Sequence, residues 1–365
     1  MSGVHHFVPV LHRGDAVGRH TLGLREASRK RGFRSEIFVD TVDDETADET
    51  VPVLSYPELA EPGDVVVYQF ATASAMAPWL AGRSDTLVVN YHNVTPPELM
   101  APWDNHLALG QLRAQGDLRL LAPRSALAVA DSVYNEGHLT AAGFVRTAVV
   151  SPSAALPELV GSDAAAVSSA AASATPGRGA RWLAVGRVSP NKALEHTIAA
   201  LAVARAHGDP EATLQLVGRP ATASYVAALH RYVAELGLGD AVQFAGHASD
   251  ATVASAYARA DVLVVTSEHE GFCVPVVEAM AAGVPVVAFD QGAVPEVLGG
   301  AGVLVADKDP YALATAITAV LRDTSRRVDL VDAGRQRMAA LHLETAAERF
   351  VDLLTPLAAP AATSP

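Results

Sequence analysis

The chain has 365 residues, 50% of them hydrophobic, and a formal net charge of −13 at pH 7. This length is enough to bury a large core and predicts two domains rather than one. The acidic balance argues against a general nucleic-acid-binding protein, because affinity for phosphate backbones comes from clustered lysine and arginine. The single cysteine, Cys273, excludes an intramolecular disulfide bond and favours a reducing compartment, so we expect a cytoplasmic location.

No apolar run reaches the length of a membrane span, and residues 1–11 lack the pattern of a cleavable signal, so we expect no integral membrane segment. The first expected helix carries a basic cluster, which consists of Arg25, Arg29, Lys30, Arg31 and Arg34. We interpret this cluster as a solvated helix face. Peripheral contact with an anionic membrane stays open as the alternative.

Residues 1–150 alternate between short apolar strands and helix-length segments, as repeated βαβ units do. A helix is expected after the first strand and ends near Arg31, and the acidic stretch 40–49 is interpreted as a surface loop. The strands are predicted at 4–11, 35–40, 64–70, 86–91, 126–130 and 147–150. A first parallel sheet is therefore expected.

Residues 151–180 are rich in Ala, Ser, Pro and Gly, which predicts a flexible linker. The alternation then resumes, and a second doubly wound domain is expected over residues 181–340. A terminal helix over 341–355 can cross back to the first domain, and residues 356–365 are expected to be disordered. The strands of the second domain are predicted at 182–185, 213–217, 242–245, 261–265, 285–289 and 302–305.

Ligands of open parallel sheets bind beyond the carboxyl ends of the strands. Two such domains joined by a linker make a cleft, and the loops after the strands are expected to converge there. The informative loop residues are Gly14, Asp15, His92, Asn93, Asp131, Ser132, Arg187, Lys192, Gly246, His247 and Glu270.

Two cations, Arg187 and Lys192, follow the first strand of the second domain, and a helix is expected to begin at Asn191. The backbone N–H groups of a helix start add positive potential, so this position suits a diphosphate without a metal ion. Taken alone, such a pair of cations is more often solvated.

Two glutamates flank the start of the helix that follows strand 261–265. Glu270 lies in the strand-to-helix loop, and Glu278 falls one turn into a helix that Pro275 is placed to begin. A carboxylate buried among apolar side chains is costly without a partner. Glu278 is therefore expected to bind either a ligand or a partner in the core.

These motifs together resemble the retaining family 4 glycosyltransferases of GT-B fold. The segments that carry the resemblance are Gly186-Arg187 with Lys192, Glu270-Gly271-Phe272 with Glu278 in Glu-x7-Glu spacing, Glu278 to Val287, Tyr91 to Glu98, and Ala130 to Asn135. The expected fold is two Rossmann-like doubly wound domains that face a cleft.

The resemblance implies a hexosyltransferase that uses a nucleotide diphosphate sugar as donor, a hydroxyl acceptor, no metal and no cofactor. Arg187 and Lys192 are expected to hold the diphosphate, Glu278 the ribose hydroxyls and Glu270 the transferred sugar. The other expected donor contacts are Gly186, the backbone N–H groups of Gly271, Phe272 and Cys273, and a base site near Gly246 and His247.

His92 is expected to complete the pocket near the anomeric carbon, mainly as a positioning group. The loop around His92 offers no obvious carboxylate for a double displacement, so front-side attack is favoured, with Arg187 and Lys192 stabilising the charge that develops. Gly14, Asp15, Asn93 and Ser132 are tentative acceptor-side residues, because the first turn lacks the double glycine common in the family.

A second departure is Cys273, where many members carry glycine. Since its backbone is expected to make the contact, we expect little effect on activity. Asp307-Lys308-Asp309 has the form of a metal motif, but Asp309 before Pro310 is interpreted as a helix cap. His5 and His6 lack partners at metal-ligand spacing, so no metal site is expected.

Two other functions were weighed, a two-domain binding protein and a dinucleotide oxidoreductase. The latter is disfavoured because no Gly-x-Gly-x-x-Gly motif follows either domain-opening strand. The sequence leaves open the donor base, the sugar, the acceptor, the linkage and the oligomeric state.

Overall fold

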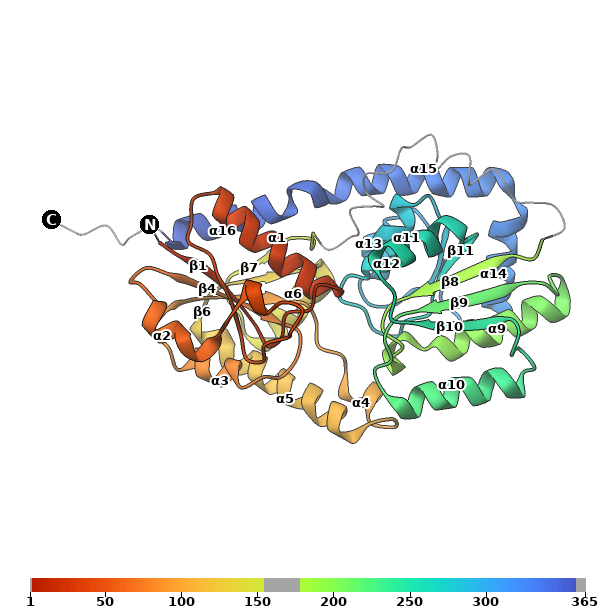
Figure 1. Ribbon diagram of the computed structural model, residues 1–365. Coiled ribbons are helices and arrows are strands. Elements are labelled where there is room, and N and C mark those ends of the chain that lie inside the picture. Colours follow the sequence, from red (N-terminus) through yellow and green to blue (C-terminus); the bar gives the residue numbers. More distant parts are fainter. Residues whose placement is uncertain (1, 154–177, 359–365) are drawn as a thin grey trace. The chain divides into compact units, whose positions relative to one another are not determined.

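The computed structural model of the chain describes residues 2–153 and 178–358, and its elements are labelled in Figure 1. The chain divides into two compact units, each built on a parallel sheet. Most of the expected linker 151–180 lies outside the described residues. Within them, unit 1 contains residues 2–97, 108–153 and 342–358, and unit 2 contains residues 98–107 and 178–341.

The sheet of unit 1 has the strand order β3-β2-β1-β4-β5-β6-β7, with neighbouring strands parallel. Its strands are β1 Val4–Val8, β2 Ile37–Val39, β3 Thr50–Pro52, β4 Val65–Phe70, β5 Thr86–Tyr91, β6 Ser125–Ala130 and β7 Thr147–Val149. Its helices are α1 Ala16–Lys30, α2 Tyr56–Leu59, α3 Met76–Ala81, α6 Val133–Ala142 and α16 Ala346–Ala358. Residues 98–107 belong to unit 2, so helix α4 Pro97–Met100 lies mostly in unit 2, and helix α5 Asn105–Leu121 begins there and continues in unit 1.

Both faces of this sheet are covered, which explains why its central strands are continuous apolar runs. Side chains of β4 alternate between two cores. Tyr68 and Phe70 belong to the core shared with α3 and α5, whereas Val65 and Val67 belong to the core that includes Phe350 of α16. Figure 1 shows α16 beside α1 on that second face.

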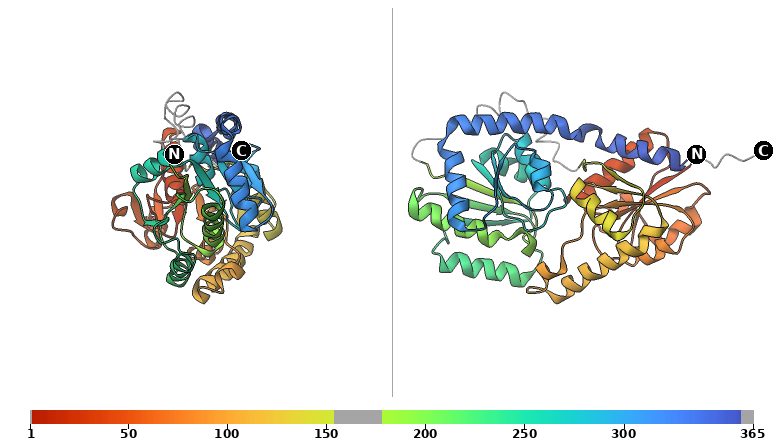
Figure 2. Two further views of the ribbon diagram at one scale, coloured as in Figure 1. Left: turned by 90° about the vertical axis from the view of Figure 1, so that its right-hand side faces the viewer. Right: turned by 180° about the vertical axis from the view of Figure 1, so that it is seen from behind.

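The sheet of unit 2 has the strand order β10-β9-β8-β11-β12-β13, also parallel. Figure 2 shows the same elements from the side and from behind. The strands are β8 Arg181–Val185, β9 Thr213–Val217, β10 Val242–Gly246, β11 Val262–Val265, β12 Val286–Phe289 and β13 Val303–Val305. The helices are α9 Leu194–His207, α10 Ala223–Glu235, α11 Asp250–Arg259, α12 Val274–Ala281, α13 Val294–Leu298, α14 Pro310–Arg322 and α15 Thr324–Leu341.

Two expected bounds and one missed strand need correction in unit 1. Strand β1 ends at Val8 rather than at residue 11, because Pro9 follows and its carbonyl accepts hydrogen bonds from Asp40 and Thr41 outside the ladder. The edge strand β3 was missed because three residues that end in a proline carry no apolar pattern. Helix α16 continues to Ala358, so the expected disorder is wrong for residues 356–358.

The extension of α16 has a packing cause. Leu357 and Ala358 join the same core as Val65 and Val67, and this contact stabilises the last turn although Pro356 lies within it. Upstream, α15 ends at Leu341 in unit 2, and His342 adopts the left-handed conformation with φ 51° before the chain enters unit 1. Residues 359–365 lie outside the described part of the chain.

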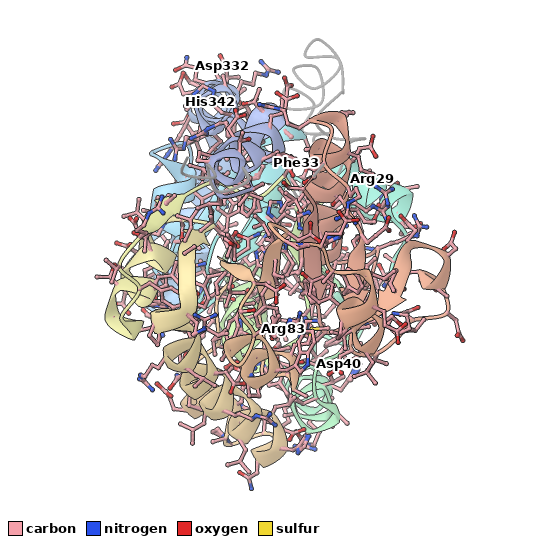
Figure 3. All side chains as sticks on the ribbon, turned by 90° about the vertical axis from the view of Figure 1, so that its left-hand side faces the viewer. Arg29, Phe33, Asp40, Arg83, Asp332 and His342 are labelled. Carbon is pink, nitrogen blue, oxygen red and sulfur yellow. The ribbon has the colours of Figure 1, made fainter. Side chains whose placement is uncertain are left out.

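The basic cluster on α1 is largely neutralised by neighbouring carboxylates. Figure 3 labels Arg29, which forms an ion pair with Glu36 at 3.1 Å. The other arginines of the cluster also pair with acids, Arg25 with Glu49, Arg31 with Asp352, and Arg34 with Glu61 and Asp64. This pairing fits the interpretation as a solvated helix face. Within the described residues, no helix is long and apolar enough to span a membrane.

Candidate functional site

Most of the expected donor residues of unit 2 lie in loops at the carboxyl ends of its strands. Arg187 follows β8 and is exposed, and it lines one pocket together with Lys192, Glu270 and Cys273. Gly186 has φ 132°, a conformation that suits glycine, and a Cβ atom there would lie 3.5 Å from the Lys192 ammonium. The Lys192 side chain therefore packs closely against Gly186 at the end of β8.

Lys192 and Glu270 form an ion pair, 78 residues apart in the chain. The Lys192 Nζ atom lies 2.5 Å from Glu270 Oε1, and Ser267 Oγ donates to the same oxygen at 2.5 Å. Burial opposes the charged form of Lys192, but the attraction of Glu270 outweighs it, and the pKa of Lys192 is raised. The lysine is therefore a permanent cation in this pocket.

The helix start expected at Asn191 needs correction. Pro190–Lys192 form a 3₁₀ turn, Ala193 adopts the left-handed conformation with φ 45°, and α9 begins at Leu194. The Leu194 N–H donates to the Tyr225 hydroxyl at 2.9 Å. The first N–H of this helix is thus satisfied by the protein, so the positive potential near Lys192 comes chiefly from side-chain charge.

The loop that carries Glu270 is held by main-chain contacts. The Glu268 N–H donates to the Asn191 carbonyl at 2.8 Å, and the Ala293 N–H donates to the Glu270 carbonyl at 3.0 Å. Gly292 makes the second contact possible, because a Cβ atom there would lie 2.6 Å from the Glu270 carbonyl oxygen. Gly271 and Phe272 follow in this loop, and both are buried.

Glu278 is 3% exposed and lies in α12. The Tyr257 hydroxyl of α11 donates to Glu278 Oε2 at 3.0 Å, and the same hydroxyl lies 3.2 Å from the Pro275 carbonyl. The sequence requires a partner for Glu278 but did not point to Tyr257, because a tyrosine 21 residues away in another helix leaves no local signal.

Cys273 lies at the N-cap of α12 with φ 73°, a left-handed conformation that favours glycine. Burial raises the pKa of its thiol, so the group is neutral. The backbone conformation explains on physical grounds why glycine is well suited to this position.

A Cys273→Val substitution is expected to lower the free energy of unfolding by about 2 kcal/mol, because a β-branched side chain is strained at this φ. Cys273→Gly, which relieves that strain, is expected to change it by less than about 1 kcal/mol. Urea denaturation of the two variants measures both values. Equal losses would contradict the assignment of strain to Cys273.

The expected base site lies at the end of β10. Gly246 has φ 66°, and the exposed His247 accepts at Nδ1 a hydrogen bond of 3.0 Å from Arg219 Nε. Arg219 follows β9 and was not among the residues expected from the sequence. It adds a cation to this end of the sheet.

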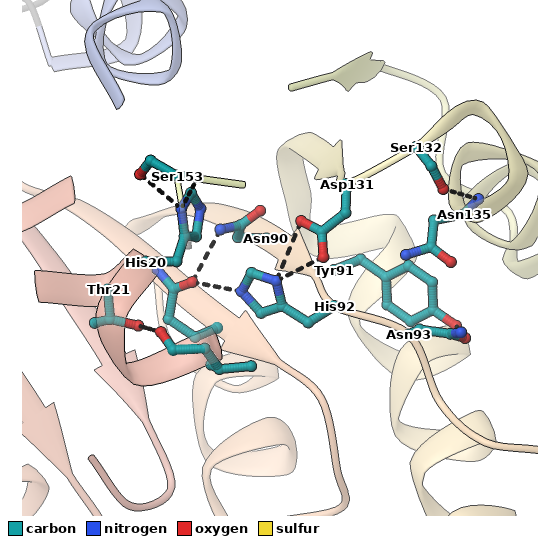
Figure 4. Close-up of polar contacts among 12 residues, drawn as sticks. His20, Thr21, Asn90, Tyr91, His92, Asn93, Asp131, Ser132, Asn135 and Ser153 are labelled. Atoms are coloured by element: carbon teal, nitrogen blue, oxygen red, sulfur yellow. Dashed lines mark hydrogen bonds and ion pairs between the residues drawn. The ribbon is translucent and has the colours of Figure 1, made fainter. Parts of the chain in front are cut away.

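In unit 1, His92 follows β5 and is held on both sides of its ring (Figure 4). Its Nδ1 atom lies 3.0 and 3.2 Å from the two oxygens of Asp131, and its Nε2 atom lies 2.8 Å from Gln69 Oε1. The side chain is 4% exposed. Asp131, which follows β6, is a carboxylate beside His92 that the sequence did not pair with it, since it lies outside the loop around His92; it is 6% exposed and paired.

Three of the four tentative acceptor-side residues have local structural contacts. Asp15 caps α1 by accepting from the Gly18 N–H at 2.7 Å, and Ser132 caps α6 by accepting from the Asn135 N–H at 3.1 Å. The Asn93 side chain accepts from the Val94 N–H at 2.7 Å. Gly14 lies in the turn before α1.

The two apparent metal motifs have other partners. Asp309 caps α14 by accepting from the Tyr311 N–H at 3.2 Å, which confirms the interpretation as a cap. His5 lies 3.4 Å from Asp64 and accepts from the Glu36 N–H. Within residues 2–153 and 178–358, no group of three or more His, Cys, Asp or Glu side chains has metal-site geometry.

The chain matches known proteins in two ways. Residues 169–337 match the family model described as glycosyl transferases group 1. A stretch of 154 residues, 40% of this chain, is 38% identical to the MMP alpha-(1->4)-mannosyltransferase of Mycolicibacterium hassiacum and covers 36% of that protein. Another, 47% of this chain, is 32% identical to the D-inositol 3-phosphate glycosyltransferase of Thermomonospora curvata and covers 42% of it. The chain thus matches less than half the length of these relatives.

Solved structures match nearly the whole fold. HepE of Anabaena, in complex with UDP and glucose, has a TM-score of 0.72 at 21% identity over 97% of this chain and 100% of that one. Sucrose-phosphate synthase from Thermosynechococcus elongatus has a TM-score of 0.75 at 21% identity over 98% and 99%. The GT-B fold expected from the sequence is confirmed.

Proposed function

We propose that the protein, whose residues 169–337 match the glycosyl transferases group 1 family model, transfers a hexose from a nucleotide diphosphate sugar to a hydroxyl acceptor. The observation that carries the proposal is the arrangement of Arg187, Lys192 and Glu270 around one pocket at the carboxyl end of the unit 2 sheet. The pocket combines two cations with an acceptor of hydroxyl hydrogen bonds.

The diphosphate is assigned to Arg187 and Lys192. Arginine offers a planar fork of donors and lysine three donors on one charge. Lys192 can keep one N–H on Glu270 and direct the others at phosphate oxygens. As the glycosidic bond to the phosphate breaks, these charges stabilise the negative charge on the leaving diphosphate.

The sugar and the nucleoside are assigned to the surrounding acceptors and loops. The contacts of Glu270 with Lys192 and Ser267 both use Oε1, so Oε2 can accept from a sugar hydroxyl. Glu278 is proposed to accept from the ribose hydroxyls, with Tyr257 orienting its carboxylate. The remaining proposed donor contacts are Gly186, Gly246, His247, Gly271, Phe272 and Cys273.

We further propose retention of anomeric configuration by front-side attack, as in glycosyltransferase family 4. The carboxylate nearest His92 is Asp131, and its burial and its hydrogen bond with His92 make it a poor nucleophile. In a front-side reaction the leaving phosphate oxygen takes the proton of the acceptor hydroxyl, so no protein nucleophile is needed. Nuclear magnetic resonance of the product reports the configuration, and inversion would contradict this mechanism.

Activity is expected to survive treatment with EDTA. Arg187 and Lys192 supply the positive charge that a divalent cation supplies in metal-dependent transferases. The measurement compares initial rates before and after chelation, with added magnesium or manganese as the control. If chelation abolishes activity and the added ion restores it, the metal-independent mechanism is wrong.

The function itself is tested by product analysis. The purified chain is incubated with UDP-glucose, GDP-mannose, ADP-glucose or dTDP-glucose and a mixture of hydroxyl acceptors, and the products are identified by mass spectrometry. Release of a nucleoside diphosphate together with a glycosylated acceptor is the expected result. Binding of a nucleotide sugar without either product would favour a two-domain binding protein instead.

A further inference from the structure

A row of buried polar side chains crosses the centre of the unit 1 sheet. His6 of β1, Gln69 of β4 and Asn90 of β5 lie on neighbouring strands and are 0%, 0% and 1% exposed, in a sheet whose central strands are mostly apolar. Buried polar groups are costly unless they are hydrogen-bonded. The row ends at His92 and Asp131, which follow β5 and β6, so it connects the sheet interior to the loop residue proposed for the reaction.

Each contact along this row is direct. Gln69 Oε1 accepts from Asn90 Nδ2 at 2.9 Å, and Gln69 Nε2 lies 3.3 Å from His6 Nδ1. The same Gln69 Oε1 lies 2.8 Å from His92 Nε2, and His92 Nδ1 lies 3.0 Å from Asp131 Oδ2. Figure 4 shows dashed contacts from His92 to Asp131 on one side of its ring and, on the other side, to a side chain that also contacts Asn90.

These contacts determine where the protons of His92 lie. A carboxylate only accepts hydrogen bonds, so His92 Nδ1 donates to Asp131. The Gln69 amide is oriented by the Asn90 amide, which donates to Oε1, and by its own NH₂ group, which donates to His6 Nδ1. Because Gln69 therefore presents an oxygen to His92 Nε2, that nitrogen donates as well. Each ring nitrogen of His92 therefore faces an acceptor oxygen of the protein.

The other histidines that face this row are neutral. The pKa of His6 is lowered to about 3 by burial and by the nearby His5 and Arg25. Burial, with the neighbouring His92 and His6, also places the pKa of His20 well below its usual value. The Ser153 N–H donates to His20 Nδ1 at 3.2 Å, which requires a lone pair on that nitrogen.

The surroundings of His92 accommodate one positive charge. His20 of α1 packs its ring against His92 edge to face, with a centroid distance of 5.4 Å, and Phe350 of α16 packs behind His20. Asp131 supplies the negative charge, and Gln69 and Asn90 supply neutral dipoles. Of His6, His20 and His92, only His92 has a carboxylate as its direct partner.

We propose that Gln69 is a positioning residue that keeps a proton on His92 Nε2 and so holds the ring in one orientation between Gln69 and Asp131, in which His92 serves the reaction neither as a base nor as a ring-nitrogen ligand of the sugar. This inference rests on the proposed glycosyl transfer. Both ring nitrogens face protein acceptors. The residue as a whole is half-buried but its side chain is only 4% exposed, so the exposed part of His92 is chiefly its main chain.

The proton positions are tested by nitrogen resonance measurements on protein labelled with ¹⁵N-histidine, without substrate. His92 is assigned by the signals that disappear in His92→Gln. Both His92 nitrogens are expected to be protonated near neutral pH in the wild type and in Gln69→Glu, which keeps an oxygen at the position of Oε1. In Gln69→Leu the Nε2 proton is expected to be lost. An unprotonated Nε2 in the wild type would overturn the proposal, even if Gln69→Leu fails to fold.

The positioning role is tested by the rate of donor cleavage with whichever of UDP-glucose, GDP-mannose, ADP-glucose and dTDP-glucose the wild type cleaves. Gln69→Leu is expected to lower kcat at least about tenfold with the donor KM within about twofold, and Gln69→Glu to keep at least about a third of kcat. A Gln69→Glu variant as slow as Gln69→Leu would contradict the proposal.

The matched control is Gln215→Leu, a glutamine of β9 in unit 2 whose amide bonds Gln243 outside both sites. It is expected to leave kcat and KM unchanged. If the wild type cleaves none of the four nucleotide sugars, the proposed function fails, and the resonance measurement still decides where the His92 protons lie.

Discussion

A Lys192→Met variant is expected to bind and turn over its donor at least about tenfold less well than the wild type, a loss of about 1.4 kcal/mol or more. The diphosphate loses one of its two proposed cations, and Glu270 loses the ammonium group that lies 2.5 Å from its carboxylate. Because this carboxylate is 9% exposed, the unpaired charge is also expected to lower the free energy of unfolding by about 3 kcal/mol. Titration calorimetry and urea denaturation measure the two losses separately.

Two variants separate the role of Lys192 in donor binding from its role in stability. Lys308→Met removes a second Lys-Glu pair, with Glu268 at 2.6 Å, whose side chains are 39% and 29% exposed. Such exposed pairs contribute less than about 1 kcal/mol, so stability is expected to stay near that of the wild type. Lys192→Met with Glu270→Gln is expected to regain stability without donor binding. Full donor affinity in Lys192→Met would contradict the assignment of the diphosphate.

Glu278→Ala is expected to weaken donor binding at least about tenfold, because the ribose hydroxyls lose their proposed acceptor. The variant also leaves the Tyr257 hydroxyl without the carboxylate that lies 3.0 Å away. Donor affinity measured by titration calorimetry reports the first effect, and urea denaturation reports the second.

Tyr257→Phe is the matched control for this second effect. It removes the hydroxyl but keeps the Glu278 carboxylate, so we expect a stability loss of about 1 kcal/mol and a donor affinity within about threefold of the wild type. If Glu278→Ala loses stability but binds the donor normally, Glu278 is a core residue and not a ribose ligand.

The fold could be predicted well from the sequence because its signals are local. Runs such as Val65-Val66-Val67 mark strands buried on both faces, and Asp309 accepts the cap hydrogen bond that its position before Pro310 indicates. The bounds were wrong where the local signal is weak or misleading, as at the short edge strand β3 and at Pro356 in α16.

The candidate site was predictable only in part. The Gly-Arg and Glu-x7-Glu motifs placed Arg187, Lys192, Glu270 and Glu278 in unit 2, but not their contacts with one another or with Tyr257. The ion pair between Lys192 and Glu270 joins two motifs across 78 residues, which spacing within either motif cannot reveal.

The His92 network was missed for a similar reason. Gln69 and Asn90 lie inside largely apolar strands, where a single polar residue gives no local indication of its hydrogen-bond partner. Their partnership with His92 depends on the order of β1, β4, β5 and β6 in the sheet, which brings together residues 23 and 39 positions apart. Tertiary pairing, not local pattern, positions this side chain.

Titration of the unmodified protein with nucleotide sugars tests the central claim most directly. We expect at least one of UDP-glucose, GDP-mannose, ADP-glucose and dTDP-glucose to bind with measurable heat and to be competed by its own nucleoside diphosphate, because Arg187 and Lys192 are proposed to bind the diphosphate. The absence of binding by all four, with the protein folded, would contradict the account.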